Sequence, residues 1–130
     1  MKLNWDIVRD VLGEVEDLPA SQQQQFTYVA VWRDEGESAV KARHAFLLRD
    51  GGFLKGVDAD TMESQTLLAP ELTWAGHELL ATIRSKVVWE RVKAMAKTKG
   101  LALTFELVKI GGKMALEQVM RGGGDTDSAP

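Results

Sequence analysis

The residues that could do chemistry in this chain are mostly lysines and arginines. These side chains neutralise phosphates, and the counterions released supply most of the sequence-independent affinity for nucleic acid. The stretch 84–99 holds six Lys and Arg residues against one Glu. At about 100° per residue, Lys86, Lys93 and Lys97 fall within a narrow arc of a predicted helix. The pattern predicts a surface for a polyphosphate or an acidic protein, with a solvated helix face as the alternative.

A second basic group lies on and after a predicted helix over 37–50. A recognition helix places its amino-terminal residues against base edges, where Arg or Lys pairs with guanine. Here Glu35 and Glu37 stand at that end. Because carboxylates repel phosphates, we expect this helix to bind DNA weakly. The residues predicted to contact nucleic acid in the two groups are Lys41, Arg43, Arg49, Lys55, Lys86, Arg91, Lys93 and Lys97.

Acidic residues crowd a predicted turn over 58–64, where a DNA-binding wing usually carries Arg or Lys. They are Asp58, Asp60 and Glu63. An acidic face can occupy the nucleic-acid site of a basic partner by charge complementarity. This turn is therefore the predicted contact surface if the partner is a protein.

Catalytic and metal-binding patterns are missing from the sequence. His44 and His77 stand in neither zinc-binding nor catalytic-triad spacing, and we expect each to be packed and hydrogen-bonded. The chain has no Cys, which excludes disulfides and thiolate metal sites. We therefore expect neither an enzyme nor a cofactor.

Composition is that of a globular domain. Of the 130 residues, 45% are hydrophobic and 27% are charged. We expect one domain over 1–121, no membrane span, no signal peptide and a cytoplasmic location. The net charge of −3 is unevenly spread, because residues 1–83 hold 7 Lys and Arg against 14 Asp and Glu, whereas residues 84–130 hold 9 against 5.

The first half of the chain predicts a helix, a strand and a second helix. Asn4 is a good N-cap for a helix over 4–17. A polar loop over 22–25 should lead into a strand over 26–32, which is rich in β-branched and aromatic residues. The next helix, 37–50, should bury Val40, His44, Leu47 and Leu48 and stop at Gly51-Gly52.

The remaining elements are a hairpin and three helices. Strands are predicted over 53–57 and 65–68, and a helix should follow Thr73, with Gly76 packed closely against backbone. Further helices are predicted over 85–99 and from 104 to 121. The second carries the apolar residues Phe105, Val108, Leu116 and Val119 and has a weak point or bend at Gly111-Gly112. The tail, 122–130, is predicted to be disordered.

This order of elements predicts an α+β, winged-helix-like domain with a small β-hairpin wing and a C-terminal helical extension. The amphipathic 104–121 segment is a candidate homodimer interface, because winged helices often dimerise through terminal helices. A monomer is the alternative.

Several segments together resemble a family of short bacterial, phage and prophage proteins of unknown function. They are Trp5-Asp6-Ile7-Val8-Arg9, His44 before Leu47-Leu48, Leu72-Thr73-Trp74-Ala75-Gly76-His77-Glu78-Leu79-Leu80 and Val88-Trp89-Glu90-Arg91-Val92-Lys93. The similarity covers most of residues 1–120. The chain departs from the family at Gly51-Gly52-Phe53, where Ala-Gly-Leu is more frequent, and in its Gly-rich tail. The resemblance implies a winged helix followed by extra helices, and a phage or mobile-element context.

Two functions follow from the residues and the resemblance. The first is a nucleic-acid-binding or transcription-regulating module that uses the two basic groups for backbone contacts with DNA. The second is a protein-interaction module, for example a phage-encoded inhibitor of a host defence system, which acts through the acidic turn on a host protein.

Overall fold

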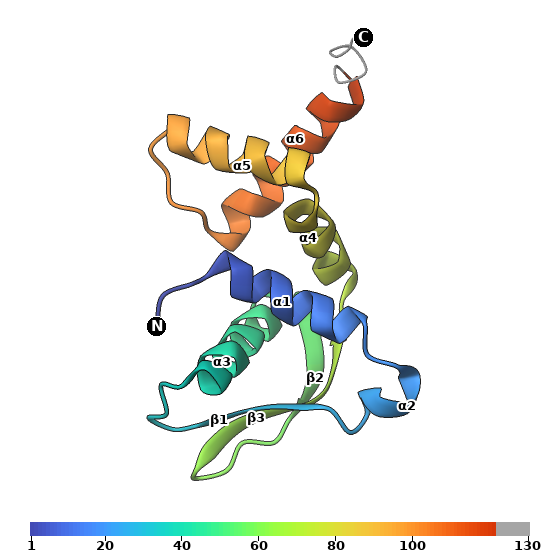
Figure 1. Cartoon of the computed structure of the whole chain (residues 1–130), viewed down its shortest axis with the longest axis vertical. Coiled ribbons are helices and arrows are strands. Elements are labelled where there is room, and N and C mark those ends of the chain that lie inside the picture. The colour runs from blue at the N-terminus through green and yellow to red at the C-terminus, as the bar shows by residue number, and fades with distance from the viewer. Residues whose placement is uncertain (122–130) are drawn as a thin grey trace. The chain divides into compact units, whose positions relative to one another are not determined.

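The chain is a mixed α+β protein with six helices and a three-stranded antiparallel sheet in its described part. The computed structural model describes residues 1–121, so the predicted disordered tail lies outside the described residues. In chain order the elements are α1 (Trp5–Glu16), α2 (Ala20–Gln23), β1 (Thr27–Val31), α3 (Glu37–Asp50), β2 (Leu54–Asp58), β3 (Ser64–Leu72), α4 (Trp74–Arg84), α5 (Lys86–Thr98) and α6 (Phe105–Arg121) (Figure 1).

The chain divides into two compact units, and the boundary between them lies within α4. The first unit, Met1–Leu80, contains the sheet, and the second, which begins at Ala81, contains the helices α5 and α6. The expectation of one domain over 1–121 stays a prediction.

Helix α1 begins as the sequence predicts. The Asn4 side chain accepts hydrogen bonds from the backbone N–H groups of Asp6 and Ile7 at 2.9 and 3.2 Å, which satisfies two of the donors that a helix start leaves free. One face of the helix is fully buried, namely Val8, Val11 and Leu12, with Val15 nearly so. The 3.6-residue spacing of these residues places them on one side of the helix.

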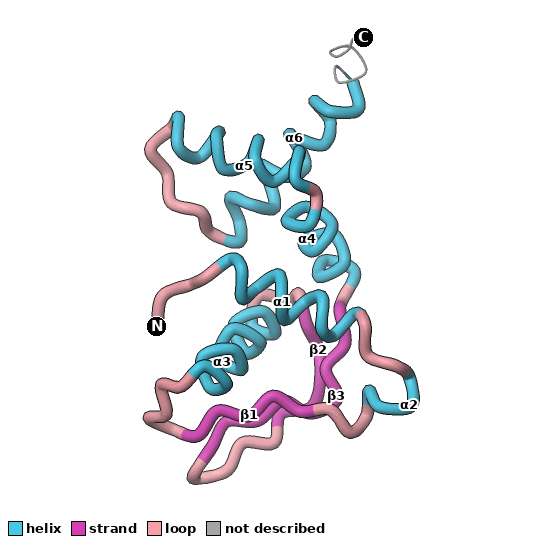
Figure 2. The backbone as a smooth tube through the Cα atoms, viewed as in Figure 1, coloured by secondary structure: helices cyan, strands magenta, loops and turns pink. Residues whose placement is uncertain are grey.

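The sheet has the strand order β1-β3-β2, with β3 in the centre. Tyr28 of β1 lies opposite Leu67 of β3, and Val57 of β2 lies opposite Leu68. Helices α1 and α3 pack against the strands, and the residues of β1 alternate between exposed and buried (Figure 2). The sheet therefore has one face toward the helices and one open face.

The end of α3 confirms the predicted glycine stop. Gly52 adopts a φ of +86°, which favours glycine, and the Phe53 N–H donates to the Leu48 carbonyl at 2.8 Å. Gly52 N–H also donates to the Arg49 carbonyl, so the last carbonyls of α3 are satisfied in a Schellman motif. The chain then turns directly into β2.

The buried face of α3 matches the prediction in part, because His44 and Leu48 are fully buried as predicted. Leu47, predicted to point inward, is 39% exposed, and Val40 is half-buried. Small residues occupy the buried positions instead, together with Phe46, Leu48 and His44: they are Ala39, Ala42 and Ala45. Helix α3 contacts α1, β1 and β2, and small side chains let it lie close to all three. A hydrophobicity pattern does not show where such small side chains are needed, because that depends on the neighbouring elements.

The polar run before β1 is also different from the prediction, which placed a loop there. Residues Ala20–Gln23 form the short helix α2. The Gln23 side-chain amide donates to the carbonyls of Ala69 at 2.9 Å and Pro70 at 3.3 Å. A tertiary contact to β3 therefore fixes this glutamine.

Helix α4 confirms both predictions made for it. The Thr73 hydroxyl accepts from the Gly76 N–H at 3.0 Å, as an N-cap residue does. A Cβ at Gly76 would lie 2.0 Å from the Phe53 carbonyl oxygen. Only glycine allows this close backbone approach.

The second unit pairs α5 with α6. Ser85 caps α5 by accepting from the Val88 N–H at 3.3 Å, and α5 is thus separate from α4. Helix α6 continues through Gly111 and Gly112, the pair predicted to weaken or bend it. Both glycines are buried. A Cβ at Gly112 would lie 2.7 Å from the Thr82 methyl carbon, so close helix packing accounts for Gly112. Of the apolar residues on α6, Val108 is fully buried, whereas Leu116 is 49% exposed.

Candidate nucleic-acid interface

The cations predicted on α3 are held by internal partners. Lys41 Nζ lies 2.9 Å from a carboxylate oxygen of Glu14 on α1. The Arg43 guanidinium donates to the backbone carbonyls of Asp34 and of Val31, the latter at 3.1 Å. Both side chains therefore hold α3 to neighbouring segments of the first unit.

Arg49 is the most deeply placed of these cations. Its guanidinium donates to Asp58 at 2.6 Å and to Asp50 at 3.0 Å, it lies over the ring of Phe46, and its side chain is only 17% exposed. Burial lowers the pKa of Arg49, but the hydrogen bonds and charges of Asp50 and Asp58 outweigh burial and raise that pKa above its ordinary value. Arg49 thus ties α3 to β2.

Lys55 is the exception in the first group. It lies on β2, is exposed, and forms no ion pair among the described residues. Of the four cations predicted around α3, the structure therefore leaves one on the surface without such a partner.

Two of the three acidic residues predicted at the turn after β2 have partners within the first unit. Asp58 binds Arg49, and the Asp60 carboxylate accepts from the Thr66 N–H at 2.9 Å. Glu63 is exposed, and its backbone carbonyl accepts from the Trp32 N–H at 3.0 Å. The predicted protein-contact residues thus lie together, but only the Glu63 side chain is left without a hydrogen bond or ion pair among residues 1–121.

Helix α5 presents its basic residues as the spacing predicts. Lys86, Lys93 and Lys97 are all exposed, whereas the opposite face buries Val88, Val92 and Ala96. We call Lys86, Lys93 and Lys97 the basic stripe. Lys93 pairs with Glu90 at 3.0 Å and lies over the ring of Trp89. Neither Lys86 nor Lys97 has a hydrogen bond or ion pair within the described chain.

Arg91 has a different position from the rest of its group. It is exposed on α5, and its guanidinium lies 3.4 Å from the side-chain oxygen of Gln118 on α6. Because it projects about 140° around the helix from Lys86, it is not part of the basic stripe. Its contact joins the two helices of the second unit.

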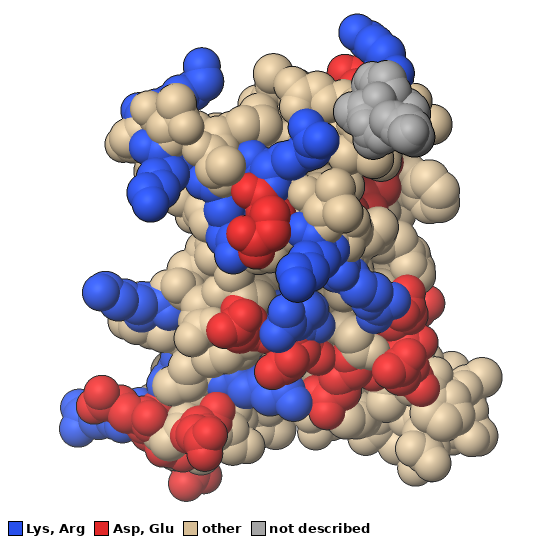
Figure 3. Space-filling model, turned by 45° about the horizontal axis from the view of Figure 1, so that its top comes forward, with Lys and Arg blue, Asp and Glu red and all other residues tan. Residues whose placement is uncertain are grey.

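The two units differ sharply in charge. Residues 1–80 hold 7 Lys and Arg against 14 Asp and Glu, whereas residues 81–121 hold 9 against 3. On the face drawn in Figure 3, acidic side chains gather over the first unit and basic side chains predominate over the second. A polyanion would therefore meet an attractive surface on the second unit.

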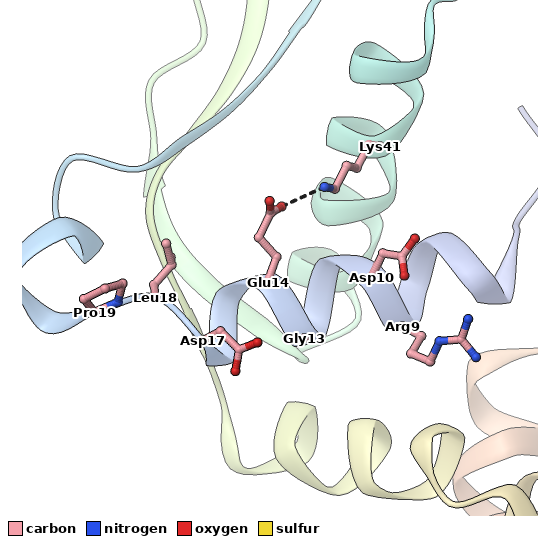
Figure 4. A pocket seen from close by; sticks show the side chains of 8 residues that line it. All are labelled: Arg9, Asp10, Gly13, Glu14, Asp17, Leu18, Pro19 and Lys41. Atoms are coloured by element: carbon pink, nitrogen blue, oxygen red, sulfur yellow. Dashed lines mark ion pairs between the residues drawn. The ribbon is translucent and has the colours of Figure 1, made fainter.

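An open pocket of about 510 Å³ in the first unit escaped the sequence analysis. Figure 4 shows its lining, in which Glu14 and Lys41 point toward each other across α1 and α3. The Glu14 carboxylate also accepts from the Tyr28 hydroxyl at 2.6 Å. Burial, followed by this hydrogen bond and the charge of Glu14, raises the pKa of Tyr28. Three separate elements supply this cluster, so no local motif could have revealed it.

The two histidines lie in different environments, one buried and one at the surface. His44 is fully buried: its Nε2 accepts from the Asn4 N–H at 2.9 Å, and its Nδ1 lies 2.8 Å from the Val40 carbonyl. Nδ1 must therefore carry the proton. His77 lies on the surface near Glu16. Among residues 1–121, no group of His, Asp and Glu side chains is arranged to hold a metal ion, and no helix is long and apolar enough to cross a membrane.

Comparison with known proteins identifies relatives but no activity. Residues 2–102 match the family described as hypothetical protein (DUF2513). An uncharacterized protein of Haemophilus influenzae is 29% identical over 120 residues, which cover 92% of this chain and 99% of that protein. No solved structure matches the chain.

Proposed function

We propose that this chain, which belongs to the DUF2513 family of hypothetical proteins, binds nucleic acid through the basic stripe of α5. The observation that carries the proposal is the exposure of Lys86, Lys93 and Lys97 along one side of a single helix. A rigid helix holds these ammonium groups in a row over about 16 Å, at 1.5 Å of rise per residue. Such a row can follow a phosphate backbone and release its counterions.

The stripe is favoured over α3 because of the partners that each set of cations has. Lys41, Arg43 and Arg49 already bind oxygen atoms of the first unit, and a phosphate would have to displace them. Lys86 and Lys97 need give up only water. The excess of cations over acids in the second unit also attracts a polyanion, whereas the excess of acids in the first repels it.

The first unit supports a winged-helix-like interpretation. The order β1-β3-β2, with α3 before the β2–β3 hairpin, is the arrangement expected of a helix followed by a wing. A strand, however, directly precedes α3, and the start of α3 is acidic. We therefore propose that this unit is a scaffold of winged-helix type that does not read bases through α3.

Phosphate contacts of this kind position a protein on nucleic acid but carry no sequence information. The proposed binding is thus weakly selective for sequence, and transcriptional regulation at a defined operator would need a reader that the stripe does not supply. The clearest expected property is a strong dependence of affinity on salt.

The test is a fluorescence-anisotropy titration of random and own-promoter DNA duplexes at several salt concentrations. Neutralising the stripe in the triple variant Lys86→Gln, Lys93→Gln, Lys97→Gln should weaken binding. It should also reduce the slope of log K against log salt by up to about 2.7, or about 0.9 for each lost phosphate contact. Affinity and slope unchanged in this variant would refute the stripe as the binding site.

A matched control removes the same charge from the other unit. Lys2, Arg9 and Lys55 are exposed residues of the first unit, and the variant Lys2→Gln, Arg9→Gln, Lys55→Gln makes the same change in net charge. It should keep the wild-type salt slope. Equal losses in both triple variants would mean that only net charge matters.

A protein-interaction role, such as inhibition of a host defence system in a phage or prophage context, is the second candidate. The 14 acidic residues of the first unit, twice the number of its basic residues, favour a basic partner. Absence of DNA binding even at low salt would leave this candidate. Glu63→Lys would then be the sharpest probe, because reversal at Asp58 or Asp60 would also break internal bonds of the fold.

A further inference from the structure

Strand β1 lies at an edge of the sheet, and its sequence leaves that edge open to pairing. Proteins usually protect exposed edges with charges, proline or a bulge. The other edge strand, β2, carries Lys55 and Asp58 and has a register irregularity between Lys55 and Val57. Strand β1, Thr27–Val31, has no charged residue and no proline.

The register shows which backbone groups of β1 face outward. The Phe26 carbonyl accepts from the Ala69 N–H, and the Trp32 N–H donates to Glu63, so even-numbered residues of β1 face β3. In an antiparallel ladder the alternate residues then point their N–H and C=O groups away from β3. These residues are Thr27, Val29 and Val31. Only the Val31 carbonyl is bound at this edge within the described chain, by Arg43 and by the Asp34 N–H.

The side chains of the open face at this edge are apolar. Val29 is 43% exposed and Val31 is 50% exposed. Around Val29 the sequence is nearly symmetric in residue type: aromatic residues stand at Phe26 and Trp32, and β-branched residues at Thr27 and Val31. Tyr28 and Ala30 are a large and a small residue. A sequence with this symmetry fits an antiparallel copy of itself.

We propose that β1 pairs antiparallel with β1 of a second copy of the chain, about a twofold axis at Val29. Val29 then exchanges both of its backbone hydrogen bonds with Val29 of the second copy. The Val31 N–H of each copy donates to the Thr27 carbonyl of the other, and the two sheets become one continuous sheet.

Side-chain pairing in this register is favourable along the whole strand. Thr27 meets Val31, large Tyr28 meets small Ala30, and Phe26 meets Trp32, and aromatic and β-branched pairs across strands stabilise a sheet. Beyond the strand, Arg33 lies opposite the uncharged Gln25. A parallel arrangement would instead bring identical charges together at Arg33, Asp34 and Glu35. A second copy, antiparallel, is therefore the occupant that this edge fits, and the inference does not depend on nucleic-acid binding.

The test measures molecular mass by sedimentation equilibrium over a series of protein concentrations. The wild-type chain should approach twice its mass of 14.3 kDa. Val29→Lys and Val29→Glu should each weaken the dimer, because like charges then face each other across the axis. An equimolar mixture of the two should recover the dimer, since Lys then faces Glu. Only an interface with Val29 opposite Val29 predicts this recovery.

A backbone variant tests the hydrogen bonds directly. Val29→Pro removes an N–H that points away from β3, so the ladder inside the unit is kept. The two lost bonds at the axis should raise the dissociation constant about 30-fold. Circular dichroism checks that the variant is folded, and if it is not, the charge-swap mixture decides. Val57→Lys, on the open face of β2, is the matched control and should leave the dimer intact.

Two results would overturn the inference. One is a wild-type chain that stays at 14.3 kDa throughout the series. The other is a dimer that the Val29 variants leave intact. If Ile110→Glu dissociated that dimer, the interface would be the exposed apolar face of α6, where Ile110 is 51% and Met114 48% exposed.

Discussion

The two units of this chain use their polar side chains in opposite ways. In the first unit Lys41, Arg43 and Arg49 each bind an oxygen atom of the same unit. In the second unit Lys86 and Lys97 have no such partner among the described residues. The reason is composition, because the first unit has twice as many acids as cations, whereas the second has a third as many. Surplus acids thus supply partners for two of the cations around α3, although Lys55 has none, whereas in the second unit only Lys93 of the basic stripe has an ion pair within residues 1–121.

The largest expected effect concerns the buried polar network of the first unit. His44→Ala removes the acceptor of the Asn4 N–H and leaves a cavity beside α1. Both changes should lower the free energy of unfolding, together by roughly 2 to 4 kcal/mol, as measured by urea denaturation. His77→Ala, at a surface position, is the control and should cost less than about 0.5 kcal/mol. Similar losses for the two histidines would contradict the structural role given to His44.

A smaller effect separates a structural cation from an available one. Arg49→Gln breaks the ion pairs with Asp50 and Asp58 at a mostly buried position and should destabilise the chain by about 1 to 2 kcal/mol. Lys97→Gln should change stability by less than about 0.5 kcal/mol. A double-mutant cycle of Arg49→Gln with Asp58→Asn measures the pair itself. Equal stabilities of the two single variants would remove the contrast between the units.

The smallest effect appears at alkaline pH. The pKa of Tyr28 is raised in the folded chain, so the folded state keeps this proton at a pH where the unfolded chain loses it. The contribution of Tyr28 to the free energy of unfolding should therefore be fully present below the ordinary pKa of 10.0. Above that pH the free energy of unfolding should fall by at most about 1.4 kcal/mol per pH unit. Denaturation at pH about 9 and about 11 measures this loss.

Tyr28→Phe is the control for that titration. It lacks the ionising hydroxyl, so the difference in stability between the two pH values should be smaller than in the wild type. Tyr28 is also the chain's single tyrosine, so the increase in tyrosinate absorbance with pH reports the ionisation of Tyr28 and of no other tyrosine. Ionisation of the folded chain near the ordinary pKa would show that burial and the Glu14 contact do not hold the proton on Tyr28.

Local sequence patterns predicted the elements well where a cap or a stop is chemically explicit. Asn4 was predicted as an N-cap, and helix starts were predicted after Thr73 and at residue 85. Each of Asn4, Thr73 and Ser85 accepts a hydrogen bond from a backbone N–H, and Gly52 ends α3 with a positive φ. The basic stripe was predicted for the same reason, because residues of one helix face are related by spacing alone. Its residues are indeed exposed, although their binding of nucleic acid remains a proposal.

Patterns failed where a residue's environment comes from distant parts of the chain. Leu47 and Leu116 are apolar but exposed, because alanines and glycines take the buried positions where helices approach closely. Gly111 and Gly112 were predicted only as a weak point or bend of α6, whereas both are buried and Gly112 packs too closely against Thr82 for a larger residue. A hydrophobicity pattern cannot show where small buried residues are needed, because the distance between two elements depends on the side chains of the element that packs against the residue.

The sequence by itself determined the helices with their caps, the uneven charge of the two halves and the cationic face of α5, because each depends on residues within a few positions of one another. Only the tertiary structure decided which cations are available. Arg43 binds the backbone carbonyl of Asp34, which lies nearby in sequence, but the Glu14 carboxylate reaches Lys41 from another helix and the Asp58 carboxylate reaches Arg49 from a strand. An ion pair forms between groups that are close in space, and the fold alone determines that proximity.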